Sequence, residues 1–287
     1  MRRVSASVTA LVLWAAAISG QVSNDRLRDA ASEPHNWLTY SGGYSGHRYS
    51  TLRQIDTANV KHLEMKWMLQ NQVVGSWEAS PLVVDGIMYL TQRPNDVMAV
   101  DARTGRLFWI YKYPGASDVR VCCGANNRGL AILGDTLFMG TLDAHLVAVD
   151  AHRGRLRWKV KVAEHTHGYS VSLAPLVVKD QVIIGVGGGE YGIRGFIAAY
   201  DSATGKEAWR FNTIPAPGEP GSETWSGDAW KTGGGSLWVT GTYDAALNLT
   251  YWGTGNPGPD FNAAQRPGDN LYTDSMVALD ADSGKLK

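Results

Sequence analysis

Two adjacent cysteines, Cys122 and Cys123, are the only cysteines among the 287 residues of the chain. They form either a disulfide between neighbours or two free thiols. A bridge between neighbours strains the intervening peptide, because adjacent Cα atoms lie about 3.8 Å apart whereas disulfides usually span about 5.5–6 Å. Such a bridge lowers the conformational entropy of the unfolded chain only slightly, so we do not expect it to stabilise the fold by much. Such a pair could instead press a flat, hard surface against a planar ligand. A zinc site lacks support, because there is no second pair of cysteines.

A glycine-rich segment at residues 187–192, Gly-Gly-Gly-Glu-Tyr-Gly, follows the apolar run 177–186. It formally matches the dinucleotide-binding pattern, but that site needs a helix next, and residues 193–201 run instead into another strand-like segment. We therefore interpret Gly187, Gly188 and Gly189 as a bend that lets the backbone approach a ligand, with Glu190 pointing toward it.

Asn256 lies in the turn Thr-Gly-Asn-Pro-Gly-Pro at residues 254–259, after an expected strand at 249–253. The preference of Asn for turns is enough to explain Asn256 when that residue is considered alone. Glu190 and Asn256 together, however, offer oxygen ligands of the kind that Ca²⁺ binds. His165 and His167 have no third ligand nearby and are interpreted as loop residues. The motifs of serine hydrolases, zincins, P-loop NTPases and c-type haem sites are absent from the sequence.

The elements that must position these residues follow an internal repeat. Three segments share the pattern Ala-x-Asp-x-x-x-Gly-x-x-x-Trp and end at Trp109, Trp158 and Trp209, roughly 50 residues apart, and a fourth begins at Ala278. In each unit a strand ends at Ala-x-Asp, the Asp starts a turn, Gly supplies a positive φ, and the next strand carries the Trp. This pattern predicts an all-β propeller of four-stranded blades, here roughly four to five of them, with each Trp packed between neighbouring blades.

Two stretches rich in Pro, Gly and Ser, residues 211–235 and 256–269, depart from the repeat and are expected to be long loops on one face. The last repeat stops before its Trp, and a partial ring leaves open sheet edges. We therefore expect residues 20–287 to form a partial propeller domain that is truncated at its carboxyl end.

Composition narrows the class of protein. Lys plus Arg and Asp plus Glu both number 27, and this balance argues against binding to nucleic acid or to an anionic membrane surface. The 33 Gly and 11 Trp favour short strands joined by tight turns. Residues 1–19 have the form of a secretory signal peptide, cleaved after Ser19, and their apolar run is too short to span a membrane. We expect an exported, periplasmic protein without a membrane span.

The motifs together resemble a known family. The chain resembles the amino-terminal half of the pyrroloquinoline quinone (PQQ)-dependent alcohol dehydrogenases of the methanol/ethanol family, from Trp37 to Lys287. The resemblance rests on five motifs in the family's order: Trp-Glu-Ala-Ser-Pro (77–81), Cys-Cys-Gly-Ala-Asn-Asn-Arg-Gly (122–129), Gly-Glu-Tyr-Gly-Ile-Arg-Gly (189–195), Gly-Ser-Leu-Trp (235–238) and Tyr-Trp-Gly-Thr-Gly-Asn-Pro (251–257).

The resemblance implies an eight-bladed propeller with PQQ near its axis. A Cys122–Cys123 bridge would form one wall of the cofactor slot and Trp238 the other. Glu190 and Asn256 would bind Ca²⁺, or a lanthanide in some relatives. The remaining implied cofactor contacts are Glu78, Arg128 and Ser172, which would hydrogen-bond PQQ, and Ser236 with Gly187, Gly188 and Gly189, which would line the slot. Ser172 and Ser236 stand where the family often has Thr, and each keeps a hydroxyl.

The implied activity is the oxidation of primary alcohols to aldehydes by hydride transfer to metal-bound PQQ, with cytochrome c as electron acceptor. The metal would polarise the quinone carbonyl while a carboxylate takes the alcohol proton. The resemblance places the catalytic Asp, and an Arg near the quinone, beyond Lys287, so no catalytic residue is assigned within the chain.

Two alternatives remain at this stage. A non-catalytic propeller scaffold of the outer-membrane assembly type explains the Trp repeat equally well, but leaves the cysteines and Glu190 without a role. The truncated chain could also fold poorly and be inert.

Overall fold

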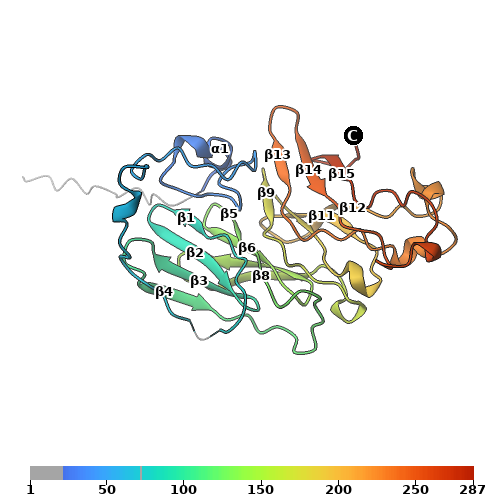
Figure 1. Cartoon of the computed structure of the whole chain (residues 1–287), viewed down its shortest axis with the longest axis horizontal. Coiled ribbons are helices and arrows are strands. Elements are labelled where there is room, and N and C mark those ends of the chain that lie inside the picture. The colour runs from blue at the N-terminus through green and yellow to red at the C-terminus, as the bar shows by residue number, and fades with distance from the viewer. Residues whose placement is uncertain (1–21, 72) are drawn as a thin grey trace, which may run out of the picture.

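The computed structural model describes residues 22–71 and 73–287, so the expected signal peptide at residues 1–19 lies outside the described residues. The strands form four antiparallel sheets that follow one another in chain order (Figure 1). The first sheet contains β1 (Leu82–Val84), β2 (Ile87–Gln92), β3 (Asp96–Asp101) and β4 (Leu107–Tyr111). The second contains β5 (Ala131–Leu133), β6 (Thr136–Gly140), β7 (His145–Asp150) and β8 (Leu156–Lys161).

The third sheet contains β9 (Leu176–Val178), β10 (Gln181–Gly185), β11 (Phe196–Asp201) and β12 (Glu207–Asn212). The fourth has three strands, β13 (Thr242–Asp244), β14 (Leu249–Gly253) and β15 (Met276–Asp280), and Leu286 forms an isolated bridge to Leu279 of β15. The predicted all-β propeller of four-stranded blades is confirmed, with four blades in the described residues and the last of them carrying three complete strands.

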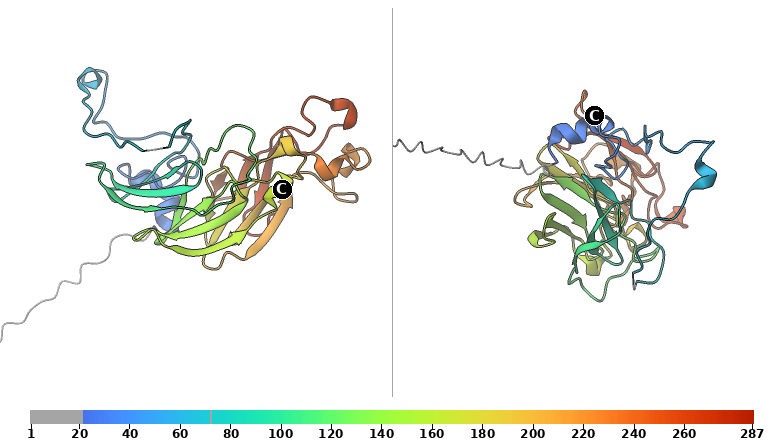
Figure 2. Two further views of the ribbon diagram at one scale, coloured as in Figure 1. Left: turned by 90° about the horizontal axis from the view of Figure 1, so that it is seen from below. Right: turned by 90° about the vertical axis from the view of Figure 1, so that its left-hand side faces the viewer.

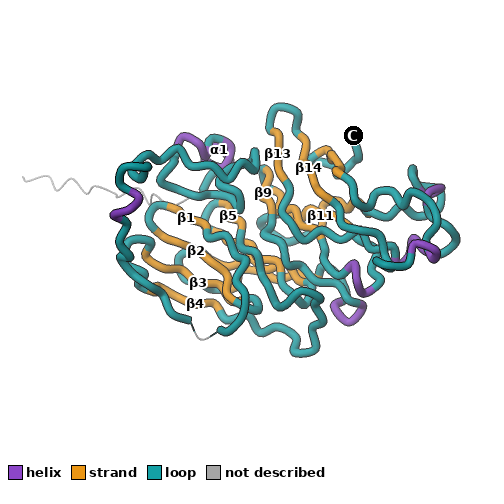
Figure 3. Tube along the Cα trace, viewed as in Figure 1, coloured by secondary structure: helices purple, strands orange, loops and turns teal. Residues whose placement is uncertain are grey.

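Helices are short and lie outside the sheets (Figure 3). They are α1 (Asn24–Arg28) and the 3₁₀ helices η1 (Ala30–Ser32), η2 (Val60–His62), η3 (His165–His167), η4 (Gly189–Tyr191), η5 (Ser222–Thr224), η6 (Ala229–Thr232) and η7 (Ala263–Gln265). No helix among the described residues is both long enough and apolar enough to cross a bilayer.

The repeated tryptophans join each sheet to the next, as the sequence predicts. The indole Nε1 of Trp109 donates to the Ala151 carbonyl at 3.2 Å, and that of Trp158 donates to the Ser202 carbonyl at 3.1 Å. Trp209 makes the same bond, at 3.1 Å, to Ala281 of the fourth sheet. Each acceptor lies in the turn that precedes the outer strand of the following sheet, so one indole fixes the spacing of two neighbouring blades.

Glycine is required in the turns that receive these indoles. Gly205 has φ +72°, and a Cβ atom built on it would lie 2.9 Å from the ring of Trp158. Gly154 holds the same relation to Trp109, with a Cβ atom at 2.4 Å. Each turn is shaped by its Asp: the Asp150 carboxylate accepts the backbone N–H groups of His152 and Arg153. The Asp and Gly of the repeat therefore present a flat turn surface to the indole of the preceding blade.

A buried carboxylate anchors the long loop that carries the two cysteines. Asp143 accepts hydrogen bonds from the Tyr113 hydroxyl at 3.1 Å, the Ala116 amide at 3.1 Å and the Thr141 hydroxyl at 2.5 Å. Burial alone would raise the pKa of Asp143, but the hydrogen bonds from His145, Thr141 and Ala116 outweigh it and hold that pKa well below its usual range. The loop entering the cysteine segment is thus tied to the second sheet through one ionised side chain.

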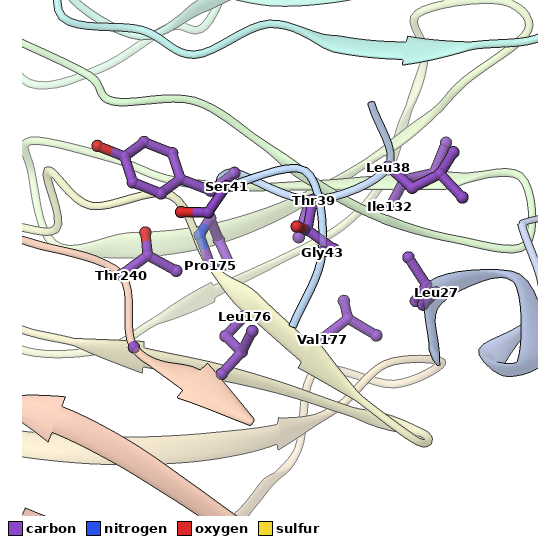
Figure 4. Close-up of a pocket in the computed structure, with 13 residues that line it drawn as sticks. Leu27, Leu38, Thr39, Ser41, Gly43, Ile132, Pro175, Leu176, Val177 and Thr240 are labelled. Atoms are coloured by element: carbon purple, nitrogen blue, oxygen red, sulfur yellow. The ribbon is translucent and has the colours of Figure 1, made fainter. Parts of the chain in front are cut away.

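A small cavity of about 20 Å³ lies between the amino-terminal segment and β9 (Figure 4). Its wall includes Leu38, Thr39, Leu176 and Val177, and the Thr39 hydroxyl is buried with no hydrogen-bond partner among the described residues. The space suffices for one water molecule, which would satisfy that hydroxyl. It is a packing feature and holds none of the predicted site residues.

We predict that Gly205→Ala destabilises the protein more than Gly134→Ala does. Both positions have positive φ, which costs an L-residue about 1–2 kcal/mol, but nothing lies within 4 Å of a Cβ atom at Gly134. At Gly205 the indole of Trp158 must also shift, which adds about 1–3 kcal/mol. Urea-denaturation midpoints measure the difference, and equal losses in the two variants would contradict the packing role of this turn.

We also predict that Asp143→Asn lowers stability at neutral pH by about 1–3 kcal/mol, because the charged acceptor of several hydrogen bonds is lost. The pKa of Asp143 is lowered in the folded state, so its contribution is present above the unfolded-state pKa of about 3.9 and is lost as the pH falls below it. The variant should therefore lose less stability than the parent between pH 5 and pH 3. Exposed Asp269→Asn is the control, and parallel pH profiles for parent and Asp143→Asn would refute this account.

Candidate functional site: a cavity at the inner ends of the blades

The predicted site residues come together at one cavity of about 340 Å³. All of them except Glu78 and Gly189 line it, namely Cys122, Cys123, Arg128, Ser172, Gly187, Gly188, Glu190, Ser236, Trp238 and Asn256. They lie in segments that lead into β5, β9 and β13 or follow β10 and β14. Residues more than 130 positions apart in sequence thus meet because successive blades bring their first strands together.

Backbone hydrogen bonds between blades hold these segments in register. The Ser80 amide donates to the Arg128 carbonyl at 3.0 Å, and the Arg128 amide donates to the Ser172 carbonyl at 2.9 Å. Further around, the Leu237 amide of the fourth blade donates to the Val186 carbonyl of the third at 2.7 Å. This chain of bonds fixes the cavity wall through the main chain, so the site side chains project from a rigid support.

Arg128 is the centre of the polar wall. Its guanidinium pairs with the Glu78 carboxylate at 2.5 Å, donates to the Ser172 hydroxyl at 3.1 Å, and lies 5.4 Å from the centre of the Trp238 ring. Glu78 also accepts a hydrogen bond of 2.6 Å from the Asn126 side chain, which donates to the Cys123 carbonyl as well. The structure therefore places Glu78 behind Arg128, where it orients the guanidinium and links it to the cysteine segment.

The sulfur atoms of Cys122 and Cys123 lie 2.6 Å apart, which is farther than the length of a disulfide bond, about 2.05 Å. Burial raises the pKa of Cys122 to about 12, and the neighbouring Cys123 thiol and Glu190 carboxylate act in the same direction. A thiol held in its protonated form is a poor nucleophile and a poor metal ligand. The Cys122 thiol is therefore suited to a contact surface, and the disulfide between Cys122 and Cys123 stays a prediction.

Two oxygen-bearing side chains face the cavity from opposite segments. Glu190 lies on η4, and Asn256 lies in the turn after β14. The Asn256 side-chain amide donates to the Asp260 carboxylate at 2.6 Å, which leaves its carbonyl oxygen free to face a cation. Among the residues that line the cavity, Glu190 is the single carboxylate. The pair can supply part of a Ca²⁺ or lanthanide shell, with further ligands from elsewhere.

Glycines keep the wall beside Glu190 flat. Gly188 has φ +111°, and a Cβ atom there would lie 2.0 Å from the Gly168 carbonyl oxygen, so no other residue fits. A Cβ atom on Gly187 would lie 3.0 Å from the Ser170 hydroxyl. Gly189 is buried beside Ser236 and does not line the cavity. The expected close approach of backbone to a ligand is thus possible at Gly187 and Gly188.

The side chains that line the cavity suit a planar ligand that carries carboxylates. Trp238 is half exposed at the cavity and offers an apolar face, and the cysteine pair offers a second flat surface. Arg128 supplies a cationic fork for a carboxylate, while the Ser172 and Ser236 hydroxyls supply further hydrogen bonds.

Several cavity residues escape sequence reasoning. They are Val121, Gly124, Asn126, Leu142, Ser170 and Tyr191. Ser170 lies two residues before Ser172 in an extended segment, and this spacing could have identified it. Leu142 follows β6 in the second blade, and nothing in its sequence neighbourhood marks it as a wall residue.

Other clusters of titratable groups are accounted for by ion pairs. His165, expected in a loop, lies on the 3₁₀ helix η3 and bonds the Asp118 carboxylate at 3.0 Å. Glu33, His35 and Asp85 lie close together, but Arg26 pairs with both carboxylates, at 2.6 Å and 2.9 Å. This cluster joins the amino-terminal segment to the β1–β2 turn.

Comparison with known proteins agrees with the site. The family model described as glucose/ethanol/alcohol dehydrogenase, beta-propeller domain, a PQQ family, matches residues 37–287. The chain is 41% identical to quinoprotein alcohol dehydrogenase PedH of Pseudomonas putida, over 98% of this chain and 50% of that protein. It is 40% identical to methanol dehydrogenase (cytochrome c) subunit 1 of Methylobacterium organophilum, over 100% of this chain and 51% of the relative.

A solved structure of a europium-containing methanol dehydrogenase superposes with a TM-score of 0.86 at 38% identity, covering 91% of this chain and 50% of that one. The chain therefore spans about half the length of the relatives that it matches. The family model covers most of the chain and coincides with the blades that build the cavity. The chain belongs to the PQQ-dependent alcohol dehydrogenase family, and residues 37–287 match its β-propeller domain.

Proposed function

We propose that this chain is the PQQ- and metal-binding part of a periplasmic quinoprotein that oxidises primary alcohols to aldehydes. The observation that carries the proposal is the meeting of Trp238, the cysteine pair, Arg128, Glu190 and Asn256 at one cavity. No single blade supplies this set, and packing does not explain why an indole and two thiols remain exposed there.

Binding and orientation are the tasks of this chain's residues. Trp238 and the cysteine pair would hold the two faces of the ring, and Arg128 would hold a carboxylate while Glu78 keeps its fork in place. Glu190 and Asn256 would ligate the metal ion, Ca²⁺ or a lanthanide, through oxygen atoms. When bound, PQQ and the metal supply the two-electron oxidation of the alcohol, with the metal as Lewis acid.

The proton of the alcohol needs a separate acceptor. Glu190 is the single carboxylate among the lining residues, and a carboxylate committed to a cation is a weak base. We infer that the base is the Asp that the family resemblance places beyond Lys287, and that hydride transfer requires it. Export by a signal peptide at residues 1–19, and electron delivery to a cytochrome c, complete the proposal; the latter is supported by the name of the Methylobacterium relative.

The test measures the affinity of the chain for PQQ by equilibrium dialysis at increasing PQQ concentrations in the presence of Ca²⁺. We predict that Trp238→Ala weakens PQQ binding about ten-fold, because one apolar face of the ring is lost. Trp230→Ala is the matched control, since Trp230 contacts Arg194 and Lys231 and does not line the cavity. Unchanged affinity in Trp238→Ala, or no PQQ binding by the parent chain, would refute the proposed slot.

A second prediction concerns the metal. Glu190→Gln preserves the shape of the side chain but removes its charge, so Ca²⁺ should no longer strengthen PQQ binding, whereas in the parent it should do so at least ten-fold. Glu223→Gln, at an exposed position outside the cavity, should behave like the parent. If Ca²⁺ strengthens PQQ binding equally in the Glu190 variant, Glu190 is not a metal ligand.

A further inference from the structure

Ser170 is a buried side chain on the cavity wall whose hydroxyl has no partner in the fold. The residue lines the cavity and is only 5% exposed. Within residues 22–71 and 73–287, its hydroxyl makes no hydrogen bond. Leaving a buried hydroxyl unpaired is unfavourable, so a polar group that enters the cavity would gain by pairing with it.

Main-chain hydrogen bonds on both sides hold Ser170 in place. Its amide donates to the Gly187 carbonyl at 3.2 Å, and the Gly187 amide donates to the Ser170 carbonyl at 2.7 Å. The next residue, Val171, is fully buried, and its amide donates to the Thr141 carbonyl after β6 at 2.9 Å. The segment thus lies where the second and third sheets stand side by side (Figure 2, left). Because side chains alternate along an extended chain, Ser170 and Ser172 both face the cavity while Val171 faces the core.

The glycine at position 187 leaves a notch in the wall beside these two serines. A Cβ atom on Gly187 would lie 3.0 Å from the Ser170 hydroxyl oxygen and 3.7 Å from the Ser172 hydroxyl oxygen. Gly187 does not have a positive φ, so its backbone conformation would accept an L-residue. The glycine therefore provides open space, and the notch formed by Ser170, Ser172 and Gly187 opens into the cavity that all three line.

The notch offers hydrogen-bond donors beside a positive charge. The Ser172 hydroxyl accepts a hydrogen bond of 3.1 Å from the Arg128 guanidinium, so its own proton remains available to a ligand. The Ser170 hydroxyl proton is available as well. Two hydroxyl donors next to a guanidinium suit an oxygen acceptor that carries negative charge, such as a carboxylate.

We propose that Ser170 is a ligand-binding residue, whose hydroxyl donates a hydrogen bond to a carboxylate of PQQ held in the notch. Ser172 donates to the same carboxylate, and Arg128 supplies the positive charge beside it. This inference rests on the proposed function, because PQQ is the ligand that brings the carboxylate. It adds a contact residue that neither the repeat nor the sequence motifs identify.

A comparison of the parent chain with Ser170→Ala, by equilibrium dialysis against PQQ in the presence of Ca²⁺, tests this role. We expect the dissociation constant to rise about ten-fold, because one hydrogen bond to a charged acceptor is lost. The urea-denaturation midpoint of the unliganded chain should not fall, since the hydroxyl bonds nothing within the fold. Ser117→Ala is the matched control: it removes a hydroxyl at an exposed position on the cysteine loop, outside the cavity wall, and should bind PQQ like the parent.

Gly187→Ala tests the notch itself. The added methyl group would occupy the notch, so PQQ binding should weaken by about ten-fold or more while circular dichroism shows an intact fold. In the double variant, Ser170→Ala should add less than about two-fold to that loss, because the carboxylate no longer reaches the hydroxyl. Fully additive losses would place Ser170 and Gly187 at separate contacts and would overturn the notch.

Failure of this inference and failure of the proposed function give different results. If the parent binds PQQ and Ser170→Ala binds it equally well, Ser170 is not a ligand-binding residue, and the proposed function is unaffected. If the parent does not bind PQQ, both proposals are wrong. If Ser170→Ala weakens binding but also lowers the urea midpoint of the unliganded chain, the serine acts through the fold, and its assignment as a ligand contact is overturned.

Discussion

The structure depends on one repeated interaction, an indole from the outer strand of one blade seated on the Asp-Gly turn of the next. The hydrogen bonds from Trp109, Trp158 and Trp209 to turn carbonyls, all between 3.1 and 3.2 Å, set the spacing of successive blades. A blade has no way to bury both of its faces alone, so this contact determines how neighbouring sheets pack. The positions of the segments at the inner ends of the blades therefore depend on these outer contacts.

The geometry of the cavity depends on these contacts between blades. The segments that carry Arg128, Ser172 and Ser236 are joined to their neighbours through main-chain hydrogen bonds, which form only if the blades stand at a fixed angle and distance. Replacing one of the outer indoles would therefore shift whole segments of the cavity wall. The glycines at 187 and 188 then add a local requirement, because the backbone there has no room for a side chain.

Features of the fold and the site that depend on nearby residues can be predicted from the sequence, whereas features that depend on contacts between distant segments cannot. The blades are predictable because the Asp, Gly and Trp of the repeat each act locally, within one turn and one strand. The cysteine pair, Glu190 and Asn256 are predictable as cavity residues because each stands in a motif of the family that the chain resembles. Leu142 and the anchoring role of Asp143 are not, because they arise from contacts between distant segments. Trp67 escapes because no Ala-x-Asp-x-x-x-Gly precedes it, although its indole donates to the Ala102 carbonyl at 3.2 Å, as the repeated tryptophans do to theirs.

The charges at the cavity bear on how cofactor and metal would bind. Arg128 and Glu190 are the two charged residues of the wall, and Arg128 is already paired with Glu78. A polyanionic ring therefore meets no excess of positive charge from the protein, and Glu190 would repel it. In the proposed site, a cation held by Glu190 and Asn256 would reverse the sign of the charge beside the bound ring. Binding of the metal and of PQQ should therefore be coupled, and because such coupling is reciprocal, each would strengthen the other by the same factor.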